Sequence, residues 1–356
     1  MPRKKKLRSS KAGLPPGALV HIGEVKTSLP SVTLTGYGDA NGVTERELPD
    51  ISMLDSEENN FPVRWLNIYG LHDAALLSAI GKRFDLHPLV LEDILNTDQR
   101  PKIDAYADYL YVVAQVYDPS RPRTDFATDQ ISIVIGHDFI LTFQEQKTGT
   151  FEPIRQRLRA EKNAIRKQGC DYLAYALLDT LVDSYFRIIE RLSDQCDDLE
   201  EEILGVPKRG ALQKAHALKR QLSHLRRLIW PLQEVMSSLQ RNQSEFFGNE
   251  TRLYLRDIYD HTVHLLEQLE DLRDLLSGLL DIYLNSVSNR VNMEVRALTV
   301  VTTMFMPAAL VTGIFGMNFR SMPLLDSPTG FWLALTAMAS VALLMLALFW
   351  RRRLLR

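Results

Sequence analysis

The pattern of apolar and polar residues changes near residue 150. Before it, short β-branched or aromatic runs are bounded by Gly, Pro or Asp, a pattern that is typical of strands. It predicts strands over residues 18–22, 32–37, 63–68, 109–117, 130–135 and 139–143. Helices are predicted over residues 71–84 and 88–95, the second with Pro88 in its first turn. We therefore expect an α/β domain over residues 14–149.

After residue 150 the pattern is helical throughout. Gly and Pro become rare, and Leu, Ile and Val recur at intervals of three or four residues. Helices are predicted over residues 152–167, 171–204, 211–240 and 250–315. At 1.5 Å per residue the last of these would be about 100 Å long, so it must pack against other helices. Residues 150–296 are expected to form a helical stalk domain.

Two uncharged apolar runs occupy residues 297–315 and 331–350. Each has 19 or 20 residues, and a helix needs roughly 20 to cross the hydrocarbon core of a bilayer. Aromatic residues at the ends of the second run, among them Trp332 and Trp350, favour the headgroup layers. The sequence thus predicts an integral membrane protein of the α+β class. Its two C-terminal transmembrane helices would be joined by an extracytoplasmic loop over residues 316–330.

The distribution of positive charge predicts the orientation of these helices. Four arginines lie in residues 351–356, and Arg290 and Arg296 precede the first run. The loop between the runs has only Arg320 as a basic residue, so the positive-inside rule places both termini in the cytoplasm. The basic residues 1–13 lack the apolar stretch of a signal peptide and are expected to be a disordered tail. Attraction of this tail to a membrane surface or to nucleic acid is the alternative.

The sequence lacks the motifs of several other classes of function. Cys170 and Cys196 form no Cys-x-x-Cys pair, which excludes a cysteine zinc site. Residues 36–42 are rich in glycine but lack the Gly-x-Gly-x-x-Gly spacing, and no phosphate loop, His-Glu-x-x-His motif or nucleophile elbow occurs in the sequence. We therefore expect no enzymatic activity, no nucleotide and no nucleic acid partner. Any ion transport would be passive.

Polar and small side chains form a stripe along the predicted helix over residues 250–315. In steps of three or four residues, the stripe comprises Asp281, Leu284, Ser288, Asn292, Val295, Leu298 or Thr299, Thr302, Met306, Ala309 and Gly313. Such a stripe should face other helices or water, because polar groups in lipid are costly. Since two transmembrane helices cannot enclose a pore, several copies of the chain would form a ring around this stripe. Ordinary helix packing through small residues is the alternative.

The tripeptide Gly316-Met317-Asn318 follows the end of this helix. Gly316 can take the left-handed conformation that ends many helices, and Asn318 would then present its amide at the mouth of the pore. Magnesium prefers oxygen ligands and sheds its water reluctantly. A neutral ring of amides would hydrogen-bond the hydrated ion and still release it. We expect Asn318 to select the ion, and a simple helix-ending turn is the alternative.

Several motifs together resemble those of the CorA family of divalent-cation channels. They are Gly13-Leu14-Pro15-Pro16-Gly17, residues 87–96 with Gln99-Arg100-Pro101-Lys102, Ile229-Trp230-Pro231-Leu232, Tyr259-Asp260-His261, Met306-Pro307 and Gly316-Met317-Asn318-Phe319. The resemblance implies a homopentamer in the prokaryotic inner membrane, with a cytosolic α/β funnel. Its stalk helices would continue into the pore-lining first membrane helix, inside an outer ring of second helices. It also implies a Mg²⁺ channel with Co²⁺ and Ni²⁺ as lesser substrates.

The same resemblance implies a regulatory metal site. Asp93 and Asp257 would face each other across neighbouring protomers and bind cytosolic Mg²⁺. Glu92 and Asp179 match a secondary site. A dication that bridges acids across an interface joins the subunits, so binding would hold the ring closed. Without the resemblance, these residues would be interpreted as solvated helix acids.

The resemblance also implies the residues of the pore. They are Asp281, Asn292, Leu298 and Met306, with Gly316, Met317 and Asn318 as the selectivity filter. Leu298 and Met306 would form an apolar constriction that gates by dewetting. The sequence departs from the family pattern where Phe315 replaces a tyrosine and Ala309 replaces a commonly polar residue. Residues 319–325 lack the acids of many members, so this loop is not expected to attract cations.

Two other interpretations of the function remain. One is a relative of the same family that carries mainly Zn²⁺, Co²⁺ or Ni²⁺. Asp257, His261 and His264 lie at helical spacing and could bind such a softer ion, with ordinary surface histidines as the alternative. A non-conducting, membrane-tethered metal sensor or scaffold is the third interpretation. The tripeptide favours a magnesium channel over the former. The uncharged stripe over residues 295–313 favours conduction over the latter.

Overall fold

The computed structural model describes residues 13–38, 42–51, 54, 61–117, 128–160, 164–205, 210–241, 246–317, 323 and 327–351. Contacts divide the chain into two compact units, residues 1–200 with 212–276 and residues 201–211 with 277–356. Residues 1–12 of the expected basic tail, Arg320 of the loop and the expected filter residue Asn318 lie outside the described residues. The domain boundaries expected from the sequence stay predictions.

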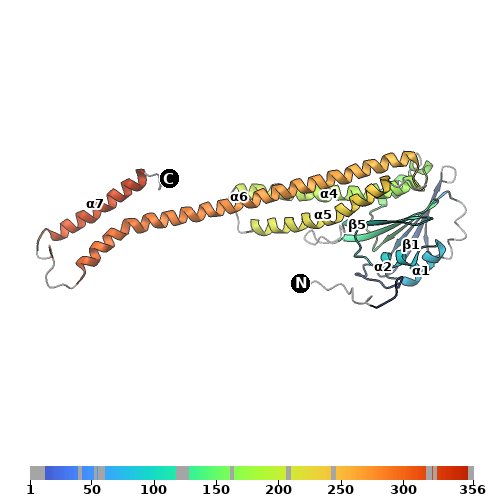
Figure 1. Ribbon diagram of the computed structural model, residues 1–356, viewed down its shortest axis with the longest axis horizontal. Helices are drawn as coiled ribbons and strands as arrows, with labels where there is room; N and C mark the ends of the chain where they lie inside the picture. The colour runs from blue at the N-terminus through green and yellow to red at the C-terminus, as the bar shows by residue number, and fades with distance from the viewer. Residues whose placement is uncertain are drawn as a thin grey trace. The chain divides into compact units, whose positions relative to one another are not determined.

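A seven-stranded sheet forms the centre of the first unit (Figure 1). The order of its strands is β2-β1-β3-β7-β6-β5-β4. Its strands are β1 (Ser31–Gly38), β2 (Gly42–Leu48), β3 (Val63–Tyr69), β4 (Lys102–Ala105), β5 (Leu110–Tyr117), β6 (Thr128–Ile135) and β7 (Phe139–Gln144). β3 and β7 pair in parallel, and the other neighbours pair antiparallel. The parallel pair needs a long connection, and that connection includes α1 (Ala74–Arg83) and α2 (Pro88–Leu95).

Five of the six predicted strands are confirmed, and the strand predicted over residues 18–22 is wrong. In that segment Ile22 forms an isolated bridge with Asn96. Its N–H bonds the carbonyl of Leu95, the last residue of α2, and its C=O accepts from the N–H of Thr97. The prediction missed β2 and β4, which lie at the two edges of the sheet. An edge strand does not need two buried faces, and the sequence of β2, Gly-Val-Thr-Glu-Arg-Glu-Leu, contains no apolar run.

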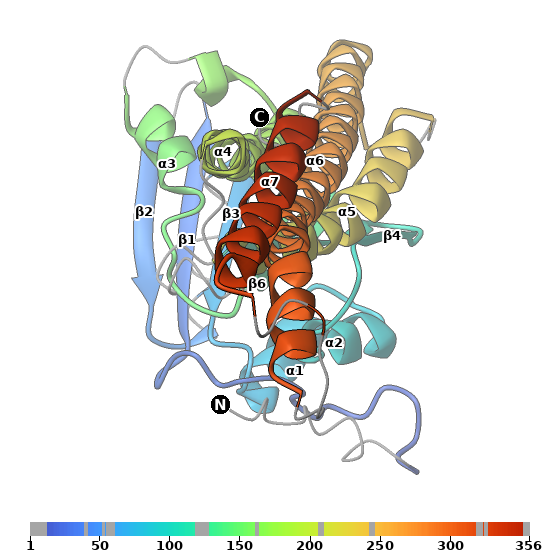
Figure 2. The same ribbon diagram turned by 90° about the vertical axis from the view of Figure 1, so that its left-hand side faces the viewer.

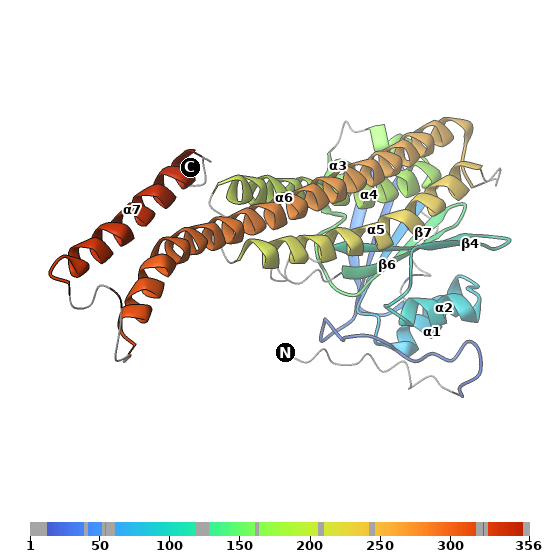
Figure 3. The same ribbon diagram turned by 60° about the vertical axis from the view of Figure 1, so that its left-hand side comes forward.

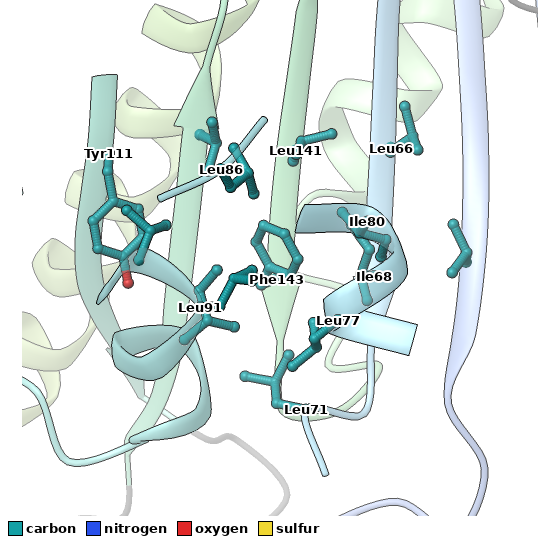
Figure 4. Close-up of a cluster of buried hydrophobic side chains, with 14 of the residues drawn as sticks. Leu66, Ile68, Leu71, Leu77, Ile80, Leu86, Leu91, Tyr111, Leu141 and Phe143 are labelled. Carbon is teal, nitrogen blue, oxygen red and sulfur yellow. The ribbon is translucent and has the colours of Figure 1, made fainter. Parts of the chain in front are cut away.

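Side chains of the central strands alternate between two buried faces. Leu66 and Ile68 of β3 lie on the face that α1 and α2 cover, together with Phe143 of β7 (Figure 4). Trp65 lies on the opposite face, where its ring centre is 6.0 Å from that of Phe151. Because helices cover both faces, successive residues of β3 and β5 are buried alike. This explains why the central strands read as continuous apolar runs.

Local signals in the sequence fix the position of α2. The Nδ1 atom of His87 accepts a hydrogen bond from the backbone N–H of Leu89 at 3.2 Å, which caps the first turn. Pro88 occupies the first helical position, where its missing N–H needs no partner. The apolar residues of α2 are buried against the sheet. Its two acids, Glu92 and Asp93, are only partly buried.

The remainder of the described chain is mainly helical. Its helices are α3 (Glu152–Arg159), the 3-10 helix η4 (Ala164–Lys167), α4 (Cys170–Leu204), α5 (Ala211–Arg241), α6 (Asn249–Phe315) and α7 (Gly330–Arg351). The single helix predicted over residues 152–167 is wrong, because α3 ends at Arg159. The Arg166 side chain donates to the carbonyl oxygens of Leu158 and Arg159 at 2.6 and 2.7 Å, which satisfies the end of α3. The other predicted helices are confirmed.

In the first unit, α4, α5 and the part of α6 up to Leu276 lie side by side (Figures 1 and 3). Figure 2 shows α4 almost end-on. Arg226 of α5 and Glu270 of α6 form an ion pair of 3.1 Å. The hydroxyl of Thr251 in α6 donates to the Asp171 carboxylate of α4 at 2.6 Å. Polar contacts thus accompany the apolar packing between these helices.

The second unit exposes large apolar helix surfaces. α6 and α7 each contain an apolar stretch of 18 residues, and neither stretch is buried. Leu298, Phe305 and Met306 of α6 are 67%, 63% and 67% exposed. A soluble monomer rarely exposes an apolar surface of this extent. Both helices are therefore candidate membrane spans, as the sequence predicts.

Candidate functional site

Asp93 of α2 is neutralised within its own chain. Its Oδ2 atom is 2.7 Å from the Nζ atom of Lys102, and its Oδ1 atom accepts a hydrogen bond from Gln99 at 2.6 Å. Lys102 also donates to Asp104 at 2.6 Å. Burial opposes the charge of Lys102, but the bonds to Asp104 and Asp93 outweigh it and raise the pKa of Lys102. A cation that binds Asp93 must therefore compete with a charged ammonium group.

Glu92 anchors the N-terminal segment to α2. Its Oε2 atom accepts a hydrogen bond from the backbone N–H of Gly17 at 2.6 Å. Gly17 has a φ of +83°, and a Cβ atom there would be 2.9 Å from the Cβ atom of Pro88. The contact thus depends on glycine. A cation at Glu92 would share this carboxylate with the backbone.

A cluster of ligand atoms lies where α4 and α6 meet. One carboxylate oxygen of Asp179, one of Asp183 and a ring nitrogen of His261 lie within 4.8 Å of one another. The two acids are one turn apart on α4 and share a face of that helix. Oxygen and imidazole ligands suit divalent cations, so this group, the Asp179 cluster, is a candidate metal site. Of its members, the resemblance implied a metal-binding role for Asp179 alone, and the sequence signal for Asp183 is its four-residue spacing.

The surroundings of Asp179 in the Asp179 cluster disfavour its negative charge. Burial and the negative charge of Asp183 raise the pKa of Asp179 to about 6, and His261 partly opposes this shift. The Nδ1 atom of His261 is covered and has no hydrogen-bond partner among the described residues. A bound dication would relieve the repulsion between the two carboxylates.

Asp257 and His264 lie near this cluster, with different contacts. The Oδ2 atom of Asp257 is 3.7 Å from the Nε2 atom of His261, and the Asp257 side chain is 62% exposed. The Nδ1 atom of His264 is instead 3.7 Å from the Oε2 atom of Glu267, and its Nε2 atom is 3.2 Å from the Nε2 atom of Gln268. The set Asp257, His261 and His264, considered for softer ions, is therefore brought together only in part.

No contact of the described residues joins Asp93 to Asp257. Asp93 contacts Gln99 and Lys102, and Asp257 contacts His261. One acid belongs to α2 and the other to α6. The resemblance places an ion bound by both acids between two copies of the chain, and this pairing stays a prediction.

α6 is one helix of 67 residues, about 100 Å long, as the sequence predicts. It carries the whole stripe over residues 281–313 without a break. The threonine hydroxyls of the stripe donate to carbonyl groups one turn back, as Thr302 does to Leu298 at 2.8 Å. Because these hydroxyls are satisfied within the helix, they could also face lipid. Polarity alone therefore does not assign the stripe to a pore.

The end of α6 corrects one expectation about the tripeptide. Gly316 is not left-handed, and its N–H still bonds the carbonyl of Thr312 at 2.9 Å. Space explains the glycine better, since a Cβ atom at this position would be 3.0 Å from the carbonyl oxygen of Thr312. Asn318 lies outside the described residues, so its role in selectivity stays a prediction.

Comparisons of the sequence with known proteins agree with this architecture. Residues 62–353 match the family described as CorA-like Mg²⁺ transporter protein. The chain is 39% identical to the cobalt/magnesium transport protein CorA of Thermotoga maritima, over 97% of this chain and 98% of that protein. It is 32% identical to the putative metal ion transporter YfjQ of Bacillus subtilis, over 86% of this chain and 94% of that protein.

Comparisons with solved structures give the same fold. The CorA magnesium transporter from Methanocaldococcus jannaschii has a TM-score of 0.77 at 23% identity, over 91% of this chain and 98% of that one. Full-length CmaX has a TM-score of 0.73 at 21% identity, over 94% of this chain and 100% of that one. The structural likenesses show a shared fold, and the sequence matches over most of the chain show the family. The chain belongs to the CorA-like Mg²⁺ transporter family of divalent-cation transporters.

Proposed function

We propose that this chain assembles as a homopentamer that conducts Mg²⁺ passively into the cytoplasm, with Co²⁺ and Ni²⁺ as lesser substrates. The observation that carries the proposal is α6, a single helix of 67 residues. Asp257 and His261 lie in its first half, and an apolar segment reaches Phe315 in its second half. Candidate cation ligands and a candidate membrane span therefore share one continuous element. The protein would lie in the inner membrane, with both termini in the cytoplasm.

In this ring, the second half of α6 lines the pore and α7 faces lipid. The exposed apolar surfaces of both helices support this arrangement, because lipid or other copies must cover them. Asp281 and Asn292 line the cytoplasmic part of the pore, and Leu298 and Met306 form the constriction that gates by dewetting. At the outer mouth, the amides of Asn318 hold the hydrated ion without removing its water.

Cytosolic Mg²⁺ closes the ring by binding between neighbouring protomers. Asp93 and Asp257 have separate contacts within one chain, which is compatible with a site that two copies share. Glu92 and Asp179 form a secondary site. Binding closes the channel only if the ion binds the closed arrangement more tightly than the open one.

Lys102→Met should make closure more sensitive to magnesium. The substitution removes the ammonium group that competes for Asp93, and a partly exposed ion pair contributes up to about 1 kcal/mol. We therefore expect the cytosolic Mg²⁺ concentration for half closure to fall by about fivefold in patch recordings. Lys82→Met, at an exposed position of α1, is the matched control. An unchanged or higher closing concentration for Lys102→Met would contradict the proposed competition.

A transporter that prefers Zn²⁺, Co²⁺ or Ni²⁺ is the second candidate function. The observation that favours it is the imidazole of His261 in the Asp179 cluster, because imidazole is a better ligand for these metals than for magnesium. The cluster need not select the transported ion, since it lies in the first unit and the expected filter follows α6. We therefore assign the cluster to regulation rather than to conduction.

Asp183→Asn should separate carboxylate repulsion from metal binding in the Asp179 cluster. With EDTA present, loss of the repulsion between the two carboxylates should raise the melting temperature by about 2 °C. The stabilisation by added Co²⁺ should become smaller, because one ligand loses its charge. Asp194→Asn, at an exposed position of the same helix, should behave like the wild type. Full stabilisation of Asp183→Asn by Co²⁺ would exclude Asp183 as a ligand.

Ion flux into proteoliposomes tests the proposed function against its alternatives. Purified protein is exposed to equal external concentrations of Mg²⁺, Co²⁺, Ni²⁺ or Zn²⁺, and the internal ion is followed with a fluorescent indicator. Fastest entry of Mg²⁺ supports the proposal. Faster entry of Zn²⁺, Co²⁺ or Ni²⁺ supports the second candidate. No entry through a correctly assembled oligomer would indicate a membrane-tethered sensor or scaffold.

A further inference from the structure

A cavity of about 350 Å³ lies in the first unit, between the end of β5, the segment before α3, and α4. Its walls include Arg187 and Arg191 together with the hydroxyl residues Thr148, Thr150 and Ser184. No acidic side chain of the described residues lines it. The chemistry of this cavity is thus opposite to that of the Asp179 cluster and suits an anion.

The two arginines supply positive charge on one face of α4. Arg187 and Arg191 are one turn apart, so their like charges repel each other. The guanidinium carbon of Arg191 is 5.0 Å from the centre of the Tyr117 ring, and its Nη1 atom is 3.4 Å from the phenol oxygen. This contact restricts the orientation of the Arg191 side chain. Guanidinium groups bind phosphate oxygens in a bidentate manner, and an anion between these two would also reduce their repulsion.

The segment before α3 adds a neutral hydrogen-bond donor. The Oγ1 atoms of Thr148 and Thr150 are 2.7 Å apart, and either hydroxyl can be the donor. One proton makes this bond, so the proton of the other hydroxyl is available to a ligand. Gly149 between them has a φ of +75° and has no atom within 4 Å of its Cβ position, so the backbone turns without filling the cavity. The Ser184 hydroxyl donates its proton to the carbonyl of Leu181 at 2.6 Å, so it can only accept a hydrogen bond from a ligand.

We propose that this cavity binds a small phosphorylated metabolite. A phosphate group carries a charge of about −1.5 to −2 at neutral pH, which is opposite in sign to the charge of the two arginines. The volume lies at the lower end of the range for small-molecule sites. It leaves room for a short carbon skeleton against Val116 and Ile188, which also line the cavity. The site is separate from the proposed pore and does not depend on the proposed function.

Isothermal titration calorimetry on the full chain in detergent tests this site. EDTA removes divalent cations, the probes are inorganic phosphate and glycerol 3-phosphate, and glycerol is the uncharged control. We expect saturable binding of glycerol 3-phosphate. The double variant Arg187→Gln/Arg191→Gln should bind it at least about tenfold more weakly, because two charge-assisted contacts are lost. Arg220→Gln, at an exposed position of α5 outside the cavity, should bind as the wild type does.

Two further measurements keep the test decisive. If the double variant does not fold, Thr150→Val removes a hydroxyl of the cavity wall and should weaken binding severalfold. Dihexanoyl-phosphatidylglycerol distinguishes a lipid headgroup from a soluble metabolite, and tighter binding of this lipid than of glycerol 3-phosphate would overturn the assignment to a metabolite. The site itself would be overturned if neither phosphate probe binds saturably. It would also be overturned if the double variant binds as the wild type does. Where the double variant does not fold, wild-type binding by Thr150→Val would have the same meaning.

Discussion

Asn318→Ala should reduce Mg²⁺ uptake on the order of a hundredfold while the oligomer still assembles. Each copy would lose one amide that hydrogen-bonds the hydrated ion, and a net hydrogen bond contributes about 1 kcal/mol. In the proposed ring all copies would contribute to one filter, so several such losses would act on one ion. The rate of Mg²⁺ entry into proteoliposomes measures the effect, and size-exclusion chromatography checks assembly.

Asn289→Ala is the matched control for this substitution. Asn289 is an exposed asparagine of α6 next to Ser288, so it is turned about 100° from the stripe. We expect its uptake to equal that of the wild type. Gly316→Ala should also reduce uptake, because the new Cβ atom would be 3.0 Å from the carbonyl oxygen of Thr312. Wild-type uptake by a correctly assembled Asn318→Ala protein would exclude Asn318 as the selectivity residue.

Asp257→Asn should raise the cytosolic Mg²⁺ concentration that closes the channel by about tenfold or more. A contact to a charged group contributes about 1.5–3 kcal/mol, and the substitution removes one such contact from each interface. Asp257 is 62% exposed, and its side chain contacts the ring of His261, whose Nε2 atom is 3.7 Å from Oδ2. The carboxylate is therefore available to an ion held by a second copy. Current against cytosolic Mg²⁺ measures the change.

Glu267→Gln is the control for the regulatory site. Glu267 is an exposed acid of the same helix, with a side chain that is 69% exposed, and its loss should leave closure unchanged. Asp93→Asn should act in the same direction as Asp257→Asn, and neither should change ion selectivity. Closure of both variants at the wild-type concentration would show that these acids are not the sensor.

The central strands could be predicted because both of their faces are buried. β5, with the sequence Leu-Tyr-Val-Val-Ala-Gln-Val-Tyr, is apolar almost throughout. The edge strands β2 and β4 lack this signal, since their pairing depends on neighbouring strands rather than on their own pattern. The end of α3 could not be predicted from the periodicity of apolar residues either, because the Arg166 side chain donates to the last carbonyl oxygens of this helix.

The candidate site could be predicted only in part. Asp93 and Asp179 follow from motif resemblance, but their partners depend on packing between distant segments. Lys102 reaches Asp93 from β4, and His261 reaches the Asp179 cluster from α6. Nor could the pattern of the stripe separate a pore from lipid, because hydroxyls such as that of Thr302 are satisfied within the helix.

The dependence of Mg²⁺ entry on membrane potential tests the proposed passive channel most directly. Proteoliposomes with a potassium gradient and valinomycin receive a set potential, with no nucleotide present, and internal Mg²⁺ is followed over time. A doubly charged ion gains about 4.6 kcal/mol per 100 mV on entering a negative interior. We predict that entry accelerates as the interior becomes more negative and that cytosolic-side Mg²⁺ stops it. Absence of entry at every potential, or entry at a rate independent of potential, would contradict a passive channel.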